Sequence, residues 1–535
     1  MTWSRRRLLL AAGAVGAGVT ACAPRALPPL RGRLVGGEQA ERGHRIRTAL
    51  PAGWTAPKSA VDVVIVGGGV AGLAAAWRLG RAGFRGTVAL LELADGVGGT
   101  SISGEDGVTP HPWGAHYLVM PSPGARHVRT LLREFGVITG FDADGRPFYD
   151  PTAVANAPQE RLFVDGKWED GVLPPHRSAE TDAQLAAFDA EIERLRAVVG
   201  ADGLPAFSIP VHGSSADPAL RALCGRSLAA WLDDLGLDDP ILRAALRYDT
   251  RDDFGTELND TNAWAGLHYH CARRPDPADA RDLGTDVLTW PGGNGWLVEQ
   301  LRRRLTFAPT TGAVVRAIVP EEGGVRVAYD ALDGLRELTA GHVICAVPGR
   351  VAARLLDRPI AAPDLAPWRI AQLHVDAPPA SHGVRIAWDS VVWGGRGVGY
   401  VSSAHQLGAY GGPSVLTYYD PCSVGAPADE RRALAEMSWE EHADLVFQDL
   451  GPAHWDLRAR VQRLDVRAWG HGTARPAIGE DPASFLAAAR PHPRVSLAHT
   501  DRSGMSLFEE ASWHGIRAAE EALVALGVPA GGTLL

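Results

Sequence analysis

Residues 61–80 read VDVVIVGGGVAGLAAAWRLG, in which an apolar run leads through three glycines into an alanine-rich segment. The valines and isoleucine of 61–66 predict a parallel strand covered on both faces, and residues 72–82 predict a helix. Gly67, Gly69 and Gly72 fit the pattern G-x-G-x-x-G. In this pattern the first glycine permits a tight turn, the second admits a pyrophosphate close to the backbone, and the third lets the helix pack on the strand. The stretch therefore predicts a dinucleotide-binding turn.

The start of the predicted helix should face the phosphates, because free backbone amides at a helix N-terminus bind anions. Val70 and Ala71 stand at this position. A second strand is predicted at 87–91 and ends at Glu92, whose carboxylate is placed to accept hydrogen bonds from a ribose diol. An acid here would repel a 2′-phosphate, which argues against NADP. The turn alone leaves both NAD and FAD open.

The composition is that of a large globular protein, with 535 residues of which 46% are hydrophobic and 21% charged. The net charge is −9, and no segment beyond the extreme N-terminus concentrates arginine without acidic residues, so nucleic acid is not expected as a partner. The only lysines are Lys58 and Lys167. No C-x-x-C pair occurs, and His268 and His270 stand two apart on a predicted helix, so no metal site is expected.

The first 22 residues have the features of an export signal. Arg5, Arg6 and Arg7 precede an apolar run of small residues, 8–19, that is too short to span a bilayer. The paired arginines resemble a twin-arginine signal, and the segment ending at Cys22 resembles a lipobox. We therefore expect export to the periplasm or cell envelope and a lipid anchor at Cys22. Residues 23–57, rich in Pro, Gly and Arg, are expected to form a linker.

The segment that follows Glu92 indicates which dinucleotide is bound. It carries a second glycine pair, Gly98 and Gly99, followed by Thr100. Here the sequence resembles the flavin-containing amine oxidase superfamily, which includes protoporphyrinogen oxidases and phytoene desaturases. Members of that superfamily carry Arg-x-Gly-Gly in this segment, which wraps the flavin side of the cofactor. In this chain Gly96 stands where the arginine is usual.

Two further segments carry the same resemblance. Residues 113–117, Trp-Gly-Ala-His-Tyr, are similar to the family segment that passes the isoalloxazine ring, which places Trp113, Gly114 and His116 near the flavin. Residues 494–501 form an apolar strand that closes on Asp501, which by resemblance would bond the ribityl or pyrophosphate region. A helix starting near 512–515 would then direct its positive end at the flavin pyrimidine. The resemblance thus implies FAD as the cofactor.

Motifs and resemblance together predict an α/β fold, with a discontinuous Rossmann-like FAD-binding domain and an inserted α+β substrate domain. The FAD-binding domain is expected at 58–116, 289–358 and 463–530, and the substrate domain at 117–288 and 359–462. The middle FAD-binding segment is expected to contain a helix, two alternating strands, a turn-rich connection and a return strand, at 297–305, 313–318, 325–329, 330–339 and 342–348.

The reaction site is expected beside the closing segments. Residues 467–476 resemble the family stretch in which an aromatic commonly stands by the reactive ring, so Trp469 and His471, with His116, are the candidates for catalytic residues. A flavin oxidase mainly needs to hold its substrate in line with N5 and to exclude water. The charged run 248–254 is expected to be a solvated or ion-paired helix end without a catalytic role.

The favoured function is that of an exported FAD-dependent oxidoreductase that oxidises an amine or a similar small organic substrate by hydride transfer to N5. Oxygen, a quinone or a redox protein would accept the electrons. Many amine oxidases of this superfamily keep a lysine that holds water at N5, and neither lysine of this chain lies in the corresponding region. One alternative is a desaturase or dehydrogenase of an apolar isoprenoid or tetrapyrrole substrate, which a wide apolar channel would favour. Another is a flavin-carrying electron-transfer or binding protein.

Overall fold

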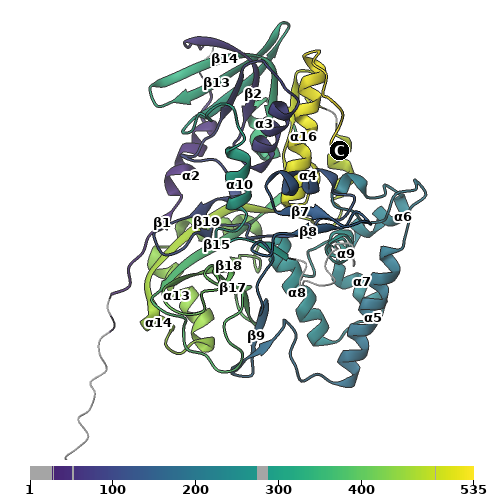
Figure 1. Cartoon of the computed structure of the whole chain (residues 1–535), viewed down its shortest axis with the longest axis vertical. Coiled ribbons are helices and arrows are strands. Elements are labelled where there is room, and N and C mark those ends of the chain that lie inside the picture. Colours follow the sequence, from purple (N-terminus) through teal and green to yellow (C-terminus); the bar gives the residue numbers. More distant parts are fainter. Residues whose placement is uncertain (1–26, 28, 51–53, 274–286, 489) are drawn as a thin grey trace, which may run out of the picture.

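The computed structural model describes residues 27, 29–50, 54–273, 287–488 and 490–535. The predicted signal segment and its Cys22 lie outside these residues. Within the described ranges no helix is long and apolar enough to cross a membrane. The chain forms two layered parts. The sheet next to the glycine turn lies in the upper half of Figure 1, and a larger sheet with most of the helices lies in the lower half.

The upper part is built on a six-stranded sheet in the order β12-β13-β14-β2-β3, with β20 beside the end of β14. The strands β20, β14, β2 and β3 run parallel, as the sequence predicts for a Rossmann-like unit. The side chains of 63–66 on β2 are fully or almost fully buried because helices cover both faces of the sheet. The strand bounds are Lys58–Val66 (β2), Val88–Leu91 (β3), Val314–Glu321 (β12), Gly324–Ala331 (β13), Gly334–Cys345 (β14) and Val495–Leu497 (β20).

Two helices of this part, α3 and α16, pack closely against each other. Helix α3 begins at Val70, directly after the glycine turn, and packs along helix α16 in Figure 1. The packing is close because a β-carbon on Gly515 of α16 would lie 2.1 Å from the carbonyl oxygen of Ala71. The helix bounds are Val70–Arg81 (α3), Arg126–Glu134 (α4), Gly295–Arg302 (α10), Gly349–Leu355 (α11) and Phe508–Ala525 (α16).

Two predicted elements differ in extent. The connection predicted at 330–339 is mostly strand, because β14 starts at Gly334 and pairs with β13 from Ala331 onward. The closing helix α16 begins at Phe508 rather than near 512–515. Ser512–Gly515 therefore lie inside the helix and serve its packing on α3, and residues 507 and 508 form the end that faces the cavities described below.

The lower part contains an eight-stranded mixed sheet in the order β1-β19-β15-β18-β17-β16-β9-β10. Its central strands β15 and β18 are buried along almost their whole length. The bounds are Leu34–Val35 (β1), Glu160–Val164 (β9), Lys167–Asp170 (β10), Asp364–Val375 (β15), Asp389–Val392 (β16), Gly399–Ser402 (β17), Ser414–Pro421 (β18) and Val461–Arg475 (β19). Helices α12, α13 and α14, at Pro427–Glu436, Trp439–Leu450 and Leu457–Arg460, accompany this sheet.

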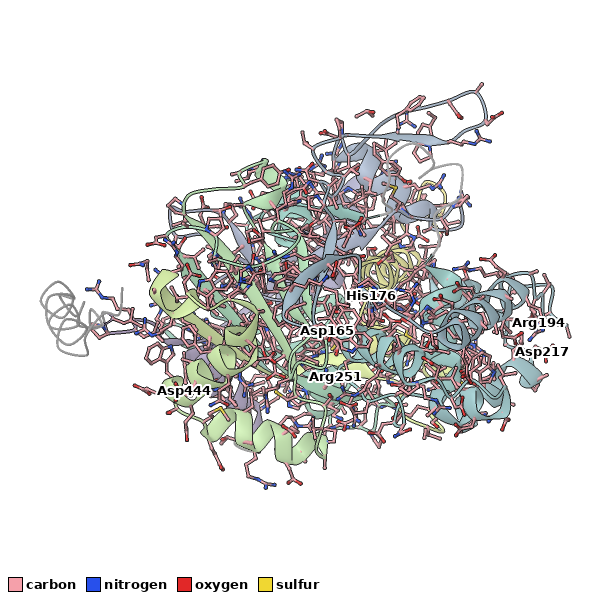
Figure 2. The ribbon with its side chains drawn as sticks, turned by 90° about the horizontal axis from the view of Figure 1, so that it is seen from below. Asp165, His176, Arg194, Asp217, Arg251 and Asp444 are labelled. Atoms are coloured by element: carbon pink, nitrogen blue, oxygen red, sulfur yellow. The ribbon has the colours of Figure 1, made fainter. Side chains whose placement is uncertain are left out.

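A helical region adjoins the sheet, and short strand pairs link it to the cofactor-binding part. Figure 2 shows Arg194 of α5 at one side of the molecule and Asp444 of α13 at the other. The helices are Ala179–Arg196 (α5), Pro218–Arg221 (α6), Leu228–Asp234 (α7), Pro240–Phe254 (α8), Ala263–Ala272 (α9) and Pro482–Ala487 (α15). The strand pairs are Ser103–Gly104 with His111–Pro112 (β4, β5), Tyr117–Val119 with Val287–Thr289 (β6, β11) and Ile138–Phe141 with Pro147–Tyr149 (β7, β8).

The N-terminal segment differs from the expected linker. Strand β1 pairs in parallel with β19, and the carbonyl oxygen of Arg31 accepts a hydrogen bond from the amide of Leu464 at 2.8 Å. Helix α2, Gly37–His44, follows and is anchored where Arg42 donates to the carbonyl oxygen of Leu93 at 2.8 Å. The domain boundary differs too, since β19 belongs to the large sheet although residues from 463 are predicted in the FAD-binding domain. Both differences arise from strand pairing between distant segments, which leaves no local pattern.

Candidate functional site

A cavity of about 390 Å³ opens at the carboxyl ends of the parallel strands. It lies where a dinucleotide binds in such sheets. The residues predicted to hold the cofactor that line it come from the glycine turn, the end of β3, the second glycine pair and the segment after β20. They are Gly67, Gly69, Val70, Ala71, Glu92, Gly98, Gly99, Thr100 and Asp501.

The glycine turn has the geometry that a pyrophosphate needs. Gly67 has a φ of +102°, and a β-carbon on Gly72 would lie 1.9 Å from the carbonyl oxygen of Gly67, so both positions require glycine. A β-carbon on Gly69 would meet only one atom, at 3.9 Å, and would project into the free space of the cavity. No side chain caps the first turn of α3, so its amides are free to bind an anion. These features fit FAD.

Glu92 is held in place by the same turn. One carboxylate oxygen accepts a hydrogen bond from the amide of Gly68 at 2.6 Å, and the other from the amide of Ala94 at 2.8 Å. Burial raises the pKa of Glu92, and these amide hydrogen bonds oppose that effect. Each oxygen keeps a second lone pair for a ribose hydroxyl.

Asp501 presents an acceptor to the other side of the cavity. It lies in a 3₁₀ turn, Thr500–Arg502, and its Oδ2 accepts a hydrogen bond from the amide of Gly349 at 2.7 Å. Its Oδ1 is buried and lies 3.0 Å from Nδ1 of His499. Burial acts to raise the pKa of Asp501, but His499 and the Gly349 amide outweigh it, so the pKa lies below its usual value. A buried ionised carboxylate on the wall of the cofactor cavity fits a hydroxyl of the ribityl chain or of the pyrophosphate-linked ribose.

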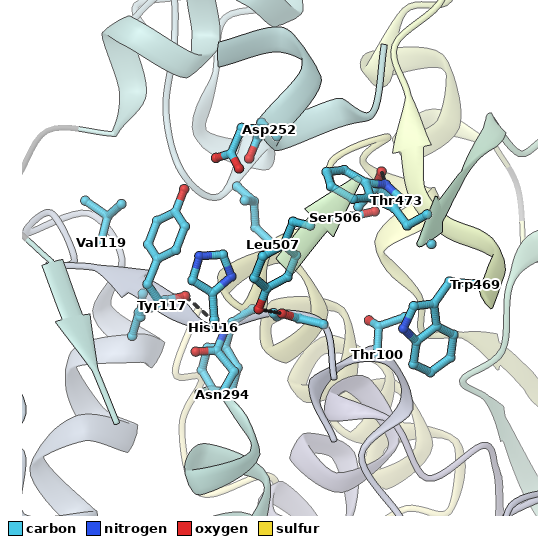
Figure 3. A pocket seen from close by; sticks show the side chains of 18 of the residues that line it. Thr100, His116, Tyr117, Val119, Asp252, Asn294, Trp469, Thr473, Ser506 and Leu507 are labelled. Carbon is cyan, nitrogen blue, oxygen red and sulfur yellow. Dashed lines mark hydrogen bonds between the residues drawn. The ribbon is translucent and has the colours of Figure 1, made fainter. Parts of the chain in front are cut away.

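A second cavity, of about 140 Å³, adjoins the first. Seven residues line both cavities, and we call them the junction: Thr100, Ala115, Trp469, Gly472, Ser506, Leu507 and Phe508. Figure 3 shows Thr100, Trp469, Ser506 and Leu507 around this second cavity. We call the second cavity the substrate pocket, because a planar ring that reached the junction from the cofactor cavity would form its floor.

Aromatic rings form one wall of the substrate pocket. The ring of His116 lies 4.6 Å from that of Tyr419 and 5.1 Å from that of Tyr117, measured between ring centroids. Burial lowers the pKa of His116 to about 4, so its imidazole is neutral at pH 7. Tyr419 donates a hydrogen bond to the carbonyl oxygen of Gly114 at 2.9 Å, and Trp469 donates to that of Trp113 at 2.6 Å. Two strands of the large sheet thereby hold the 113–116 segment against the junction.

Acidic side chains form another part of the pocket wall, from a segment predicted to have no such role. Asp252 and Asp253 of α8 line the pocket together with Arg273. Asp253 is ion-paired with Arg273, which also donates a hydrogen bond to the hydroxyl of Tyr117 at 3.1 Å. Burial raises the pKa of Asp252 to about 7, and the neighbouring Asp253 acts in the same direction. The charged run 248–254 is thus partly ion-paired, which is one of the two predicted alternatives, and it also forms part of a pocket wall.

The other predicted site residues lie as follows. His116 and Trp469 line the substrate pocket, whereas His471 lines the cofactor cavity alone. Gly114 lines the substrate pocket. Trp113 lines neither cavity; it is buried in an apolar cluster with Trp368, and it contributes its backbone oxygen to Trp469. The catalytic roles of these residues stay predictions.

The two lysines lie away from both cavities. Lys58 starts β2 and is 3.2 Å from a carboxylate oxygen of Glu337, and Lys167 of β10 is ion-paired with Glu169. Among the described residues no group of three or more histidine, cysteine or acidic side chains is arranged to hold a metal ion. The side chains that line the substrate pocket include aromatic, hydroxyl and carboxyl groups.

Solved structures of low sequence identity share this fold. A putrescine oxidase bound to putrescine aligns with 88% of this chain and all of its own, with a TM-score of 0.63 and 18% identity. Cyclohexylamine oxidase from Brevibacterium oxydans aligns with 87% of this chain and 99% of its own, with a TM-score of 0.62 and 18% identity.

Sequence comparison is more specific. A protein of Mycobacterium tuberculosis that is provisionally named flavin-containing monoamine oxidase AofH is 28% identical over 301 residues, which is 55% of this chain. The chain spans 58% of the length of that relative. Residues 70–523 match the family described as flavin containing amine oxidoreductase. The chain is therefore a member of the flavin-containing amine oxidoreductases, a family of enzymes that bind FAD.

Proposed function

We propose that this enzyme oxidises a small amine whose reacting carbon lies at the junction of the two cavities. The observation that carries the proposal is the set of seven residues that line both cavities, because it leaves a substrate and a flavin ring in direct contact there. When bound, FAD supplies a hydride acceptor at N5 of its ring. The amine loses a hydride from the carbon that bears nitrogen and a proton from nitrogen, and water then hydrolyses the imine.

The residues of the pocket support this chemistry by placement. Trp469, Tyr419 and His116 hold the substrate carbon in line and exclude water from it. The neutral imidazole of His116 adds no positive charge that would repel an incoming ammonium group. A small pocket with acidic and aromatic walls favours an amine over an apolar isoprenoid or tetrapyrrole, for which a wide apolar channel is expected.

Anaerobic mixing tests the proposal. Purified protein loaded with FAD is mixed without oxygen with a series of primary alkylamines, and the visible absorption of oxidised flavin is followed. We expect bleaching that saturates with amine concentration. A flavin that stays oxidised with every amine, but is bleached by a reduced protein or quinol, would instead support an electron-transfer role.

The electron acceptor is a separate part of the proposal. Both lysines lie away from the junction, so we propose that a quinone or a redox protein reoxidises the flavin faster than oxygen does. After reduction by an amine, the rates of recolouring by air and by a soluble quinone are compared. Faster recolouring by air would contradict this part.

We also propose export by the twin-arginine route and a lipid anchor at Cys22, on the sequence of residues 1–22. Cell fractionation of a bacterium that makes the full chain tests both. Replacing Arg5, Arg6 and Arg7 by lysine should keep the protein in the cytoplasm, and Cys22→Ser should release it from the membrane. A wild-type chain found in the cytoplasm would contradict export.

A further inference from the structure

The substrate pocket has an acidic wall that is separate from the cofactor cavity. Asp252, Asp253 and Glu509 line the pocket, and none of them lines the cofactor cavity. Arg273 is the one permanently charged basic side chain among the described residues of this wall, and its guanidinium is ion-paired with Asp253. The wall therefore carries two carboxyl groups beyond those that Arg273 balances.

These two carboxyl groups, of Asp252 and Glu509, accept no hydrogen bond from another residue in the part of the chain that the structure describes. Glu509 is 5% exposed, and its carboxyl group receives a hydrogen bond from no described residue except its own amide. Asp252 has no hydrogen-bond partner among the described residues, and it lines the pocket. A buried carboxylate without a partner costs free energy, and a cationic ligand in the pocket would remove that cost.

The charges that face Asp252 are mostly of its own sign. Asp249 and Asp253 lie on the same helix, Glu160 lies on β9 and Asp389 on β16, and among the described residues only Arg273 has the opposite sign. Burial raises the pKa of both Asp252 and Glu509 to about 7. Both groups would ionise more readily beside a bound cation, so the pocket is suited to a ligand that brings positive charge with it.

Asp252 and the junction residue Trp469 lie in different parts of the pocket. In Figure 3 the carboxyl group of Asp252 lies at the top, above the rings of Tyr117 and His116, and Trp469 of the junction lies at the lower right. A substrate that fills the pocket would place a second group at the acidic wall.

We propose that the pocket selects diamines or polyamines, and that Asp252 and Glu509 bind the ammonium group that does not react. The inference rests on the proposed amine oxidation and adds the class of amine. Amino acids are not expected as substrates, because their carboxylate would need to pair with the guanidinium of Arg273. The guanidinium of Arg273 is already engaged by Asp253 and Tyr117, so a carboxylate finds little there.

The test compares 1,4-diaminobutane with 1-aminopentane, in which a methyl group replaces the second ammonium. The concentration dependence of anaerobic flavin reduction gives the specificity ratio between the two amines. We expect wild-type protein to prefer the diamine by about 10-fold to 100-fold, the range for a charge-assisted hydrogen bond. Asp252→Asn and Glu509→Gln should each reduce this ratio. Asp252→Glu keeps a carboxyl group at this position and should retain much of the wild-type ratio.

A binding measurement gives an independent readout. Calorimetric titration of the FAD-loaded protein with 1,4-diguanidinobutane and with 1-guanidinobutane compares a dication with a monocation, neither of which has a free amine. The dication should bind more tightly to the wild type and lose that advantage in Asp252→Asn. The matched control is Asp260→Asn, an exposed acid that follows α8 and lies outside the pocket, which should keep the wild-type ratio.

The outcomes are distinct. Equal rates and affinities for the paired compounds in wild-type protein, a preference for leucine over both amines, or an unchanged ratio in folded Asp252→Asn and Glu509→Gln would each overturn the inference. Failure of every amine to bleach the flavin would instead contradict the proposed function.

Discussion

Gly69 and Gly72 stand three residues apart in the first turn and have different neighbours. A β-carbon on Gly72 would lie 1.9 Å from a backbone oxygen, whereas one on Gly69 would enter the space of the cofactor cavity. We therefore expect Gly72→Ala to destabilise the protein by about 1–3 kcal/mol. Gly69→Ala should leave the stability of the apoprotein nearly unchanged and weaken FAD binding. Thermal unfolding of apoprotein and titration with FAD measure the two effects.

Gly96 supplies the control for these variants. A β-carbon there would meet nothing within 4 Å, so Gly96→Ala should unfold and bind FAD as the wild type does. A Gly72→Ala protein as stable as Gly96→Ala would show that the turn tolerates a side chain.

Asp252 should make the apoprotein less stable at high pH. Burial raises its folded-state pKa to about 7, while an unfolded aspartate titrates near 3.9. The folded state holds the proton more tightly, so the stability from this group is fully present below pH 3.9 and is lost as the pH rises through 7. Asp252→Asn should therefore be more stable than the wild type at pH 8, by on the order of 1 kcal/mol. This difference in stability should be smaller at pH 5. Chemical unfolding at both pH values tests this, and a variant less stable at pH 8 would contradict it.

At the residue scale, the sequence identified groups whose role follows from a local pattern. Glu92 and Gly98 belong to motifs with fixed spacing, and the structure places both in the cofactor cavity. The sequence assigns no catalytic role to Asp252, because an acidic run at a helix end looks the same whether solvent or a pocket faces it. The sequence does not identify Tyr419 or Glu509, because both reach the pocket only through tertiary packing. The density of aspartates in 249–253, next to buried Thr250 and Phe254, was the available signal.

The contact between α3 and α16 carries a prediction at the scale of elements. A β-carbon on Gly515 would lie 2.1 Å from the carbonyl oxygen of Ala71, at the first turn of α3. Gly515→Ala should push the helices apart, lower the unfolding temperature and release FAD, because the same turn faces the cofactor cavity. A β-carbon on Gly80 of α3 would meet nothing within 4 Å. Gly80→Ala should therefore be neutral or should stabilise the protein by up to about 1 kcal/mol.

Flavin content after gel filtration and thermal unfolding compare the two variants. Equal flavin content in Gly515→Ala and Gly80→Ala would show that the α3–α16 contact does not support the cofactor site.

Elements with strong local periodicity were predictable, and their ends were less so. Strand β2, helix α3 and strand β3 occur within a few residues of the predicted positions. The start of α16 was placed too late because Leu507 provides no side-chain cap, although Glu509 and Glu510 in the first turn are typical of a helix start. The pairing of β14 with β13 extends the strand through a segment whose turn residues favoured a loop.

The N-terminal segment makes a prediction about the whole molecule. Strand β1 adds to the large sheet, and Gly43 and Ile46 line the cofactor cavity. A chain that begins at residue 27 should unfold at the temperature of the full chain. A chain that begins at residue 54 should unfold at least about 3 °C lower, since it loses several hydrogen bonds, and should retain less FAD. Equal unfolding temperature and flavin content in both would support a linker instead.

For the whole molecule, the sequence predicted the class of fold and the cofactor, but not how distant segments share the sheets. The assignment of 23–57 to a linker and of residues from 463 to the FAD-binding domain follows composition and order along the chain. The structure instead joins 34–35 and 461–475 in one sheet, through pairing that no local pattern encodes. Trp469 reaches both cavities because β19 runs from that sheet toward the cofactor.

A crystal structure of the FAD-loaded protein with 1,4-diguanidinobutane tests the central claim most directly, namely that substrate and flavin meet at the junction. We expect the isoalloxazine ring beside Thr100, Trp469 and Leu507, and the dication between that ring and Asp252. A ring bound away from these residues, or a dication outside the substrate pocket, would contradict it.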